Sequence, residues 1–448
     1  MEKIDVAVIG GGPAGMTAAS RIKRIHPDWK VAVFERSKYV SYAPCGIPYL
    51  LGGFANNLEE LVHYPLRVFT EERGIQVYTQ TEVIEVGEGY LRARSREASE
   101  RTFSWDKLLI ATGARPRVPP VPGVDLKGVL TIRTLESAEE GLKAISGAEN
   151  VAIVGGGYIG IELAENLVRI GKKVYLFEML PHVMPTLDPE IAQLVEAELI
   201  RHGVKLHLNE ALREIGGREK VEKIITDKGE YPVDVVFLAT GVVPETTLGD
   251  MIGVKKGATE AISVDHSMRT NVENVFAAGD AAESINLVTG KPDWFPLAPV
   301  ANKMGYVAGA TISGLNASFP GAVGTAITKA FSLEIARTGL TEEKARREGF
   351  NPLSVTISSN SRASYYPGAA TITVKLIADK DSGRLLGAQV VGGDGVLARI
   401  NTLAVLIEKH ATVTDAFFSD LAYAPPFAPV WDPVIVAARV LLGKIGQG

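Results

Sequence analysis

A glycine-rich junction occurs twice in this chain of 448 residues and limits the folds open to it. The segments "IDVAVIGGGPAGMTAASRI" at the start and "ENVAIVGGGYIGIELAENL" near residue 155 each pass from an apolar run through G-x-G-x-x-G into apolar residues at helical spacing. A second pair is "LLIATGARP" near residue 111 and "VVFLATGVVPE" near residue 239, and "NVFAAGDAAE" at 274–283 ends a further strand. These repeats predict an α/β fold with two Rossmann-like domains, the second inserted in the first.

The remainder of the chain follows a different pattern. The prolines of "RPRVPPVPG" at 115–123 exclude helix and central strand, so we interpret this segment as a linker. After residue 323, "TITVKLIADKDSGRLLGAQVVGG" predicts an antiparallel hairpin with a turn at Asp381–Gly383, followed by a helix through "VLARINTLAVLIEKH". This is typical of a separate C-terminal α+β domain that forms an interface. The predicted domains are 1–114 with 246–322, 115–245, and 323–448.

Composition excludes several classes of function. Hydrophobic residues make up 46% and charged residues 22% of the chain, and the formal charge of −5 leaves no broad basic surface for nucleic acid. No apolar run has the length of a bilayer span, so we expect no membrane partner. The first strand begins directly after the start, and only one cysteine is present. Both features predict a cytoplasmic protein without a disulfide scaffold and without a metal site.

The first glycine loop predicts a dinucleotide site. Gly10 allows the tight turn, Gly12 lets the backbone approach a pyrophosphate, and Gly15 lets helix and strand pack closely. Glu35 ends the next strand, "KVAVFE", at the spacing of a ribose-binding acid. Taken alone, Glu35 is equally compatible with a solvated charge at a strand end, but the fingerprint favours the ribose role.

The second loop repeats this arrangement. Gly155, Gly157 and Gly160 form the fingerprint, and Glu178 closes "KKVYLFE". An acid at this position accepts hydrogen bonds from a free 2′-hydroxyl and repels a 2′-phosphate. The sequence therefore predicts a preference for NADH, with NADPH possible where basic neighbours compensate.

Cys45 is the only cysteine, and it lies between Pro44 and Gly46 in "SYAPCGIPYL". A lone cysteine is most often a small buried hydrophobic residue. The stiff neighbours instead predict a thiol directed at a bound cofactor. A thiolate is the nucleophile, so we expect a lowered pKa, supplied by a helix beginning near Gly46 and by the bound cofactor.

Over nearly its full length the chain resembles the FAD-dependent pyridine nucleotide-disulfide oxidoreductases, through "GGGPAG", "ATGARP", "GGGYIGIE" and "AAGDAA". The single-cysteine segment, "YYPGA" and "YAPPFAPVWDP" are similar to the coenzyme A-disulfide reductase branch, which includes NADH oxidases and CoA-dependent sulfur reductases. The resemblance implies FAD at the first fingerprint, with Asp280 near the ribityl chain. It implies NAD(P)H at the second, where Tyr158 gates the nicotinamide pocket.

The cofactor contacts implied in this way fall into two sets. For FAD they are Gly10, Gly12, Pro13, Ala14, Gly15, Glu35, Arg36, Val83, Ala111, Thr112, Gly113, Gly279, Asp280, Pro296 and Ala298. For NAD(P)H they are Gly155, Gly157, Tyr158, Ile159, Gly160, Glu178 and Gly241.

Coenzyme A, as substrate or bound thiol, needs cations for its phosphates. Thr17, Arg21 and Arg24 stand at i, i+4 and i+7 on one face of the first helix. From the residues alone this is equally a solvated helix face, and the resemblance turns the balance towards CoA. It adds Ser41, Arg73 and Asn302 as further contacts.

The resemblance also implies the chemistry. Electrons pass from NADH through FAD to a bond between the Cys45 sulfur and a second sulfur or an oxygen. With no other cysteine, that partner comes from outside the chain, as a small thiol or as a sulfenic oxygen. Tyr423 and Tyr365 of a second subunit are expected to act near the departing thiolate, which requires a homodimer, while Tyr366 is expected to be a core residue.

Three functions remain open from the sequence. The first is reduction of CoA disulfide, or of CoA persulfide and polysulfide, through a Cys45 mixed disulfide. The second is an NADH oxidase that reduces O2 through a Cys45 sulfenic acid, although Pro13 stands where such oxidases and peroxidases carry His. The third is a redox-sensing flavoprotein. Pro44 stands where some CoA-disulfide reductases have Asn, which puts one CoA contact in doubt.

Overall fold

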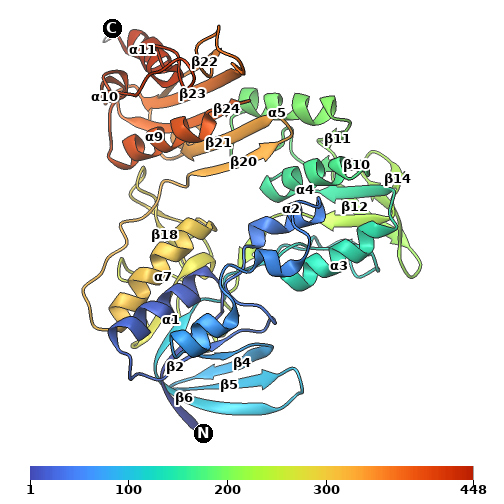
Figure 1. Cartoon of the computed structure of the whole chain (residues 1–448), viewed down its shortest axis with the longest axis vertical. Coiled ribbons are helices and arrows are strands. Elements are labelled where there is room, and N and C mark those ends of the chain that lie inside the picture. Colours follow the sequence, from blue (N-terminus) through green and yellow to red (C-terminus); the bar gives the residue numbers. More distant parts are fainter. Residues whose placement is uncertain (447–448) are drawn as a thin grey trace.

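The computed structural model describes residues 1–446 as three packed parts (Figure 1). The first part is a sheet of order β3-β2-β1-β6-β5-β4, in which β17 pairs with β6. β1, β2, β3, β6 and β17 are parallel, with Ile9 opposite both Phe34 and Ile110. The strands of this sheet are β1 (Glu2–Ile9), β2 (Val31–Phe34), β3 (Gln76–Tyr78), β4 (Thr81–Gly87), β5 (Tyr90–Ser95), β6 (Glu100–Ile110) and β17 (Val275–Ala277).

Two helices, α1 (Pro13–Ile25) and α7 (Ala298–Ile312), pack against each other beside this sheet. Their close approach needs glycine: a Cβ at Gly305 would lie 2.3 Å from the carbonyl oxygen of Ala14, and one at Gly309 would lie 2.7 Å from that of Ala18. The short elements of this part are η1 (Pro44–Gly46), α2 (Ile47–Leu51), η2 (Leu58–Leu61), η3 (Val68–Glu72), α6 (Thr247–Asp250), η4 (Gly279–Ala281), β18 (Ser284–Ile285) and β19 (Pro292–Asp293).

The second part is a parallel sheet of order β11-β10-β9-β15-β8, with an antiparallel β12-β13-β14 sheet beside it. Its strands are β8 (Val129–Leu130), β9 (Asn150–Val154), β10 (Lys173–Glu178), β11 (Lys205–Leu208), β12 (Leu212–Gly217), β13 (Val221–Thr226), β14 (Glu230–Pro232) and β15 (Val235–Leu238). Its helices are α3 (Leu135–Ser146), α4 (Tyr158–Arg169) and α5 (Pro189–Arg201). Because β17 returns to the first sheet after this part, the second Rossmann unit is inserted in the first, as predicted.

The expected proline linker is partly structured. β7 (Ala114–Pro116) pairs antiparallel with β16 (Val242–Pro244), so the outgoing and returning segments form a two-stranded ribbon between the two Rossmann parts. Proline is tolerated here because the ribbon has free edges, unlike a central strand. The interpretation of 115–123 as a plain linker is therefore corrected at its first residues.

The C-terminal part is an antiparallel sheet of order β20-β21-β24-β23-β22 covered by helices. The predicted hairpin is confirmed as β23 and β24, and the predicted helix as α9. The elements are β20 (Ala326–Ala330), β21 (Leu333–Gly339), α8 (Glu342–Arg347), β22 (Pro352–Asn360), β23 (Thr371–Asp379), β24 (Leu385–Gly392), α9 (Val396–Glu408), α10 (Val413–Phe417) and α11 (Pro433–Ile445).

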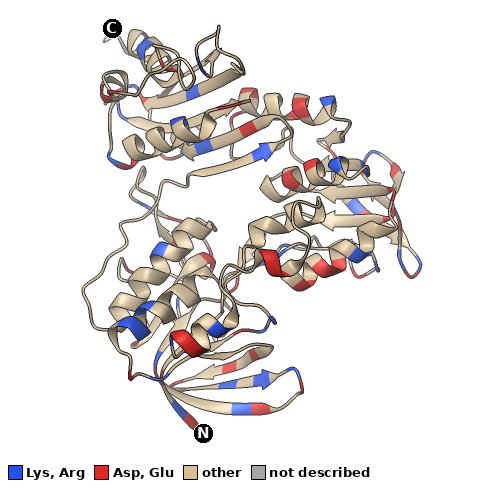
Figure 2. Ribbon diagram, viewed as in Figure 1, with Lys and Arg blue, Asp and Glu red and all other residues tan. Residues whose placement is uncertain are grey.

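Charged residues of both signs are interspersed over all three parts (Figure 2). Within residues 1–446, no helix combines the length and the apolar character needed to cross a membrane.

A glycine-to-alanine pair tests how tightly α4 packs on its strand. A Cβ at Gly160 would lie 1.9 Å from the carbonyl oxygen of Gly155, whereas one at Gly147, at the end of α3, would meet no atom within 4 Å. We expect Gly160→Ala to lower the free energy of unfolding by about 1–3 kcal/mol. Gly147→Ala, the matched control, should change it by less than about 0.5 kcal/mol. Urea denaturation followed by circular dichroism measures both, and equal effects would contradict the packing argument.

Candidate active site

The two glycine loops have the same geometry. Gly10 has φ +110° and Gly155 has φ +108°. A Cβ at Gly10 would lie 2.2 Å from the carbonyl oxygen of Ala111, and a Cβ at Gly155 would lie 2.3 Å from that of Ala239. Each loop is therefore in close backbone contact with the Ala-Thr-Gly corner of a neighbouring strand. By contrast, a Cβ at Gly12 or Gly157 would meet no protein atom within 4 Å. The side of each loop where a pyrophosphate would bind is therefore open.

The two predicted ribose-binding acids, Glu35 and Glu178, accept similar hydrogen bonds from the backbone. Glu35 accepts hydrogen bonds from the N–H of Gly11 at 2.7 Å and of Ser37 at 2.8 Å. Glu178 accepts them from the N–H of Gly156 at 2.8 Å and of Leu180 at 2.9 Å. Burial raises the pKa of Glu35, although the two backbone donors oppose this effect. Each carboxylate oxygen retains a free lone pair after these bonds, so a ribose hydroxyl can still be accepted. The ribose role stays a prediction.

Asp280 lies in η4 between α1 and α7, but it has a partner that the sequence did not reveal. Its carboxylate forms an ion pair with Arg133 at 2.8 Å, and its carbonyl oxygen accepts the indole N–H of Trp294 at 2.8 Å. Gly279, with φ +77°, packs against Ala14 of the first glycine loop. Arg133 precedes a capped helix in "TIRTLESA", which gives no signal that its side chain reaches Asp280.

The other predicted FAD contacts surround these segments. Two hydrogen bonds join the corner at Thr112 and Gly113 to Glu245. The Thr112 hydroxyl donates to the carbonyl oxygen of Glu245 at 2.5 Å, and the N–H of Glu245 donates to the carbonyl oxygen of Gly113 at 2.9 Å. Arg36 is exposed, Val83 and Ala111 are buried in the core, and Ala298 begins α7 beside η4. Pro13 begins α1, and Pro296 lies just before α7.

Cys45 lies in the short turn η1, which runs directly into α2, and its side chain is exposed. Desolvation by the surrounding chain raises the pKa of the Cys45 thiol, and the carboxylate of Glu162 acts in the same direction, while Arg133 opposes them. The helix that begins near Gly46 therefore does not lower this pKa as expected, and the contribution expected of the flavin stays a prediction. A turn continued by only five helical residues supplies too little dipole to offset burial and a nearby carboxylate.

Tyr158 and Ile159 begin α4 at the second glycine loop and are half-buried. The Tyr158 hydroxyl lies 3.5 Å from the hydroxyl of Thr186. Gly241, with φ +94°, accepts a hydrogen bond from the N–H of Arg117 in the ribbon between the Rossmann parts. One turn into α4 is Glu162, a residue that sequence reasoning missed.

Among the titratable groups of the second Rossmann part, Glu162 has the largest effect on the pKa of Cys45. Burial raises its pKa to about 7, and its carboxylate accepts a hydrogen bond from the Thr328 hydroxyl of β20 at 2.7 Å. The periodicity of "GGGYIGIELAENL" predicts a helix but not that this acid affects the pKa of Cys45, because the second part is distant from Cys45 in the sequence.

Four of the residues predicted to contact CoA lie in two pairs, and Arg21 and Ser41 have other partners. The Thr17 hydroxyl donates to the side-chain oxygen of Asn302 at 2.8 Å, joining α1 to α7. Arg24 and Arg73 line one recess of about 450 Å³. Ser41, with φ +51°, donates its N–H to the carbonyl of Gly11.

Aromatic partners that the sequence did not reveal fix two of these arginines. The Arg21 guanidinium lies 4.5 Å from the ring centre of Tyr306, and Arg73 lies 4.8 Å from that of Phe69. Arg73 also donates to the hydroxyl of Ser20 at 2.8 Å. Arg21 and Arg73 are therefore held in place, whereas Arg24 is exposed on its helix face.

The three tyrosines of the C-terminal part are exposed: Tyr365 by 76%, Tyr423 by 48% and Tyr366 by 38%. The interpretation of Tyr366 as a core residue is wrong. The loops that carry Tyr365 and Tyr423 are adjacent, because the N–H of Ala363 donates to the carbonyl of Pro425.

Buried Arg399 joins the same two loops. It donates to the carbonyl of Ser361 at 2.8 Å and forms an ion pair with Asp432 at 2.9 Å. Exposed apolar side chains lie in or near the second loop, at Phe418, Phe427, Val430 and Trp431. Exposed apolar groups of this kind mark an interaction surface.

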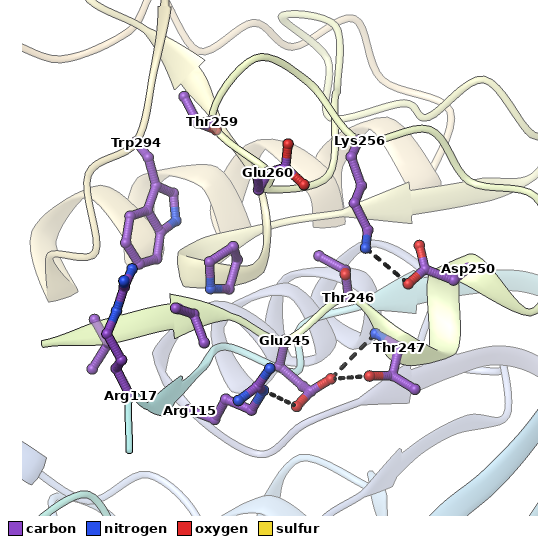
Figure 3. A pocket seen from close by; sticks show the side chains of 13 residues that line it. Arg115, Arg117, Glu245, Thr246, Thr247, Asp250, Lys256, Thr259, Glu260 and Trp294 are labelled. Atoms are coloured by element: carbon purple, nitrogen blue, oxygen red, sulfur yellow. Dashed lines mark hydrogen bonds and ion pairs between the residues drawn. The ribbon is translucent and has the colours of Figure 1, made fainter. Parts of the chain in front are cut away.

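A separate cavity of about 400 Å³ lies at the ribbon between the Rossmann parts (Figure 3). Its ion pairs join Arg115 to Glu245 and Lys256 to Asp250, so its charges are largely compensated. None of the predicted site residues lines it.

Comparison with known proteins matches two family descriptions. "Pyridine nucleotide-disulphide oxidoreductase" covers residues 4–305, and the dimerisation domain of the same family covers residues 325–433. The chain belongs to the pyridine nucleotide-disulphide oxidoreductases. Members of this family depend on FAD and NAD(P)H, and the two open glycine loops fit two dinucleotides. The fold class predicted from the sequence is confirmed.

Individual relatives cover nearly the whole chain. The "NAD(P)H sulfur oxidoreductase (CoA-dependent)" of Pyrococcus furiosus is 49% identical, over 98% of this chain and 100% of the relative. The "NADH oxidase" of Methanocaldococcus jannaschii is 36% identical, over 98% and 99%. A solved "NAD-Dependent Persulfide Reductase from A. fulgidus" is 41% identical with a TM-score of 0.95, over 98% of this chain and 83% of that one.

The electrostatics of Cys45 can be tested at Glu162. Above pH 7 the Glu162 carboxylate is ionised and disfavours the Cys45 thiolate. Glu162→Gln removes that charge, so we expect the pKa of Cys45 to fall and the thiol to be alkylated faster at pH 8. The pH dependence of iodoacetamide modification of the reduced holoenzyme measures this. Glu139→Gln, at an exposed acid of α3 that acts on neither Cys45 nor Glu162, should leave the profile unchanged. An unchanged profile in Glu162→Gln would contradict the assignment.

Proposed function

We propose that the protein reduces CoA disulfide, or CoA persulfide and polysulfide, with NAD(P)H through a mixed disulfide at Cys45. The observation that carries the proposal is the exposed thiol of Cys45 in the turn η1, in a chain with no other cysteine. The resolving sulfur must then belong to the substrate. Relatives named as CoA-dependent sulfur oxidoreductase and as "NAD(P)H coenzyme A polysulfide/persulfide reductase" support this choice.

The first glycine loop, Glu35 and η4 would hold FAD, and the second loop with Glu178 would hold NAD(P)H. FAD supplies a two-electron relay between the nicotinamide and the Cys45 sulfur when it is bound. Residues 179–188, which follow Glu178, contain no Lys or Arg, and His182 contacts Glu196. A 2′-phosphate would therefore find no strong cation in this loop, so we propose NADH as the preferred donor.

Cys45 performs the sulfur chemistry. Its thiolate attacks one sulfur of the substrate disulfide, forming a Cys45 mixed disulfide and releasing one thiolate. Two electrons and a proton then cleave the mixed disulfide, which returns the Cys45 thiolate and releases the second thiol. The overall balance is NADH, one proton and one disulfide giving NAD⁺ and two thiols. With a persulfide substrate, the sulfane sulfur leaves as hydrogen sulfide.

The arginine cluster would bind the CoA phosphates. Arg24 and Arg73 line one recess. Arg21, which like Arg24 belongs to α1, stacks over the ring of Tyr306. Fixed guanidinium groups suit phosphate oxygens better than mobile ones, because less side-chain entropy is lost on binding. Thr17, Ser41 and Asn302 would add neutral hydrogen-bonding groups to this site.

We further propose a homodimer in which Tyr423 and Tyr365 act on the partner's Cys45 site as proton donors to the leaving thiolate. Their exposure and the apolar surface beside them support a partner there. Accordingly, we assign FAD binding to 1–114 and 246–322, NAD(P)H binding to 115–245, and dimerisation to 323–448.

Substitution of the nucleophile tests the reaction. We expect Cys45→Ser to lower NADH-dependent reduction of CoA disulfide, and of polysulfide with CoA, by roughly 10³-fold or more. Reduction of bound flavin by NADH should persist, which serves as the control for folding. Parallel assays of NADH consumption with CoA disulfide, polysulfide plus CoA, and O2 identify the acceptor. Faster turnover with O2 than with any sulfur substrate would favour the oxidase function and overturn the proposal.

Hybrid dimers test the shared site. A dimer of one Cys45→Ser subunit and one Tyr423→Phe subunit retains one site with an intact Cys45 and an intact partner tyrosine. We expect it to have about half the wild-type activity, whereas both parent homodimers have little. If each site used its own Tyr423, the hybrid would be as inactive as its parents.

A further inference from the structure

A fully buried lysine joins the C-terminal part to the second Rossmann part. Lys375 of β23 is only 2% exposed, and its ammonium lies 3.0 Å from Asp188, 2.5 Å from Glu190 and 3.3 Å from Glu342. Burial by itself lowers the pKa of Lys375, but the carboxylates of Glu190 and Asp188 outweigh it and raise that pKa. The lysine is therefore a charged group that the surrounding carboxylates hold in place.

Asp188, the N-cap of α5, receives its partners from the C-terminal part. Besides Lys375, the side-chain amide of Gln389 donates to its carboxylate at 2.7 Å, and the N–H of Glu342 donates to it at 3.1 Å. The N–H of Asp188 in turn donates to the Gln389 side-chain oxygen at 2.8 Å. These reciprocal bonds fix both the backbone and the side chain of Asp188.

The loop that ends at Asp188 lies against the second glycine loop. The N–H of Met184 donates to the carbonyl of Gly156 at 2.8 Å, and Thr186 contacts the Tyr158 hydroxyl. Met184 is buried with φ +51°, a strained conformation for a residue with a side chain. Such strain persists only where contacts on several sides fix the segment. Residues 179–188 thus connect the C-terminal part to the glycine loop and to Tyr158.

We propose that Lys375 and Gln389 are positioning residues that hold residues 179–188, and through them Tyr158 and the second glycine loop, in the geometry that binds the nicotinamide. The inference rests on the proposed placement of NAD(P)H at that loop. The same two parts also meet at the other end of α5, where the N–H and hydroxyl of Ser332 donate to Glu198 at 3.0 and 2.7 Å. That contact does not reach the glycine loop, so Ser332→Ala is a matched control for loss of contact between the parts.

The test compares the variants K375M, Q389L and D188N/K375M with S332A in the full-length holoenzyme. D188N/K375M removes both buried charges, so it remains informative where K375M alone folds poorly because Asp188 has lost its cation. Hydrogen exchange of residues 180–188 reports the loop directly. Anaerobic stopped-flow reduction of the bound flavin by NADH gives its rate constant and apparent Kd. Reoxidation of the reduced enzyme by CoA disulfide or polysulfide gives the second half-reaction.

We expect the three variants to exchange faster at 180–188 and to reduce flavin roughly 10- to 100-fold more slowly or with weaker NADH binding. Reoxidation should keep its wild-type rate, and S332A should match wild type in all three measurements. Wild-type flavin reduction in the variants, or an equal loss in S332A, would overturn the positioning role. Gly157→Val, whose side chain would fill the open side of the second glycine loop, distinguishes failure of the cofactor placement: if NADH binding survives there unchanged, the placement at this loop is wrong.

Discussion

The close backbone contact between each glycine loop and the neighbouring strand determines the rest of the architecture. Gly10 lies against the carbonyl of Ala111, and Gly155 against that of Ala239, at distances that leave no room for a side chain. This contact brings the end of the first strand of each unit next to an Ala-Thr-Gly corner, and it directs the following helix N-terminus into the crevice at the carboxyl ends of the strands. Two such crevices in one chain explain why two dinucleotides can act in sequence around Cys45.

Local patterns predicted what depends on local physics. The glycine loops, the acids Glu35 and Glu178, the hairpin of β23 and β24 and helix α9 follow from turn chemistry and hydrophobic period. Thr17, Arg21 and Arg24 lie in α1, as the helical spacing predicts, while their contact with CoA stays a prediction. These features require no knowledge of which distant segments meet.

The features that the sequence did not predict arise from distant contacts. Arg133 pairs with Asp280 across 147 positions of the chain, and Glu162 acts on the pKa of Cys45 from the second Rossmann part. The part of the expected pKa depression that was assigned to the helix failed for this reason, since a local helix argument omits the desolvation and the carboxylate that oppose it. Tyr366 was misjudged because composition cannot distinguish an aromatic core residue from one on an interface.

The charge around Cys45 bears on the resting state of the enzyme. Burial and Glu162 both disfavour a free thiolate, so the polypeptide stabilises uncharged forms of this sulfur. A disulfide carries no charge and escapes this cost, whereas a sulfenic acid adds a polar group that needs its own hydrogen bonds. The uncharged oxidised forms of Cys45 are therefore favoured, as the proposed mixed disulfide requires. Glu162, whose pKa is about 7, adds to this preference where it is ionised.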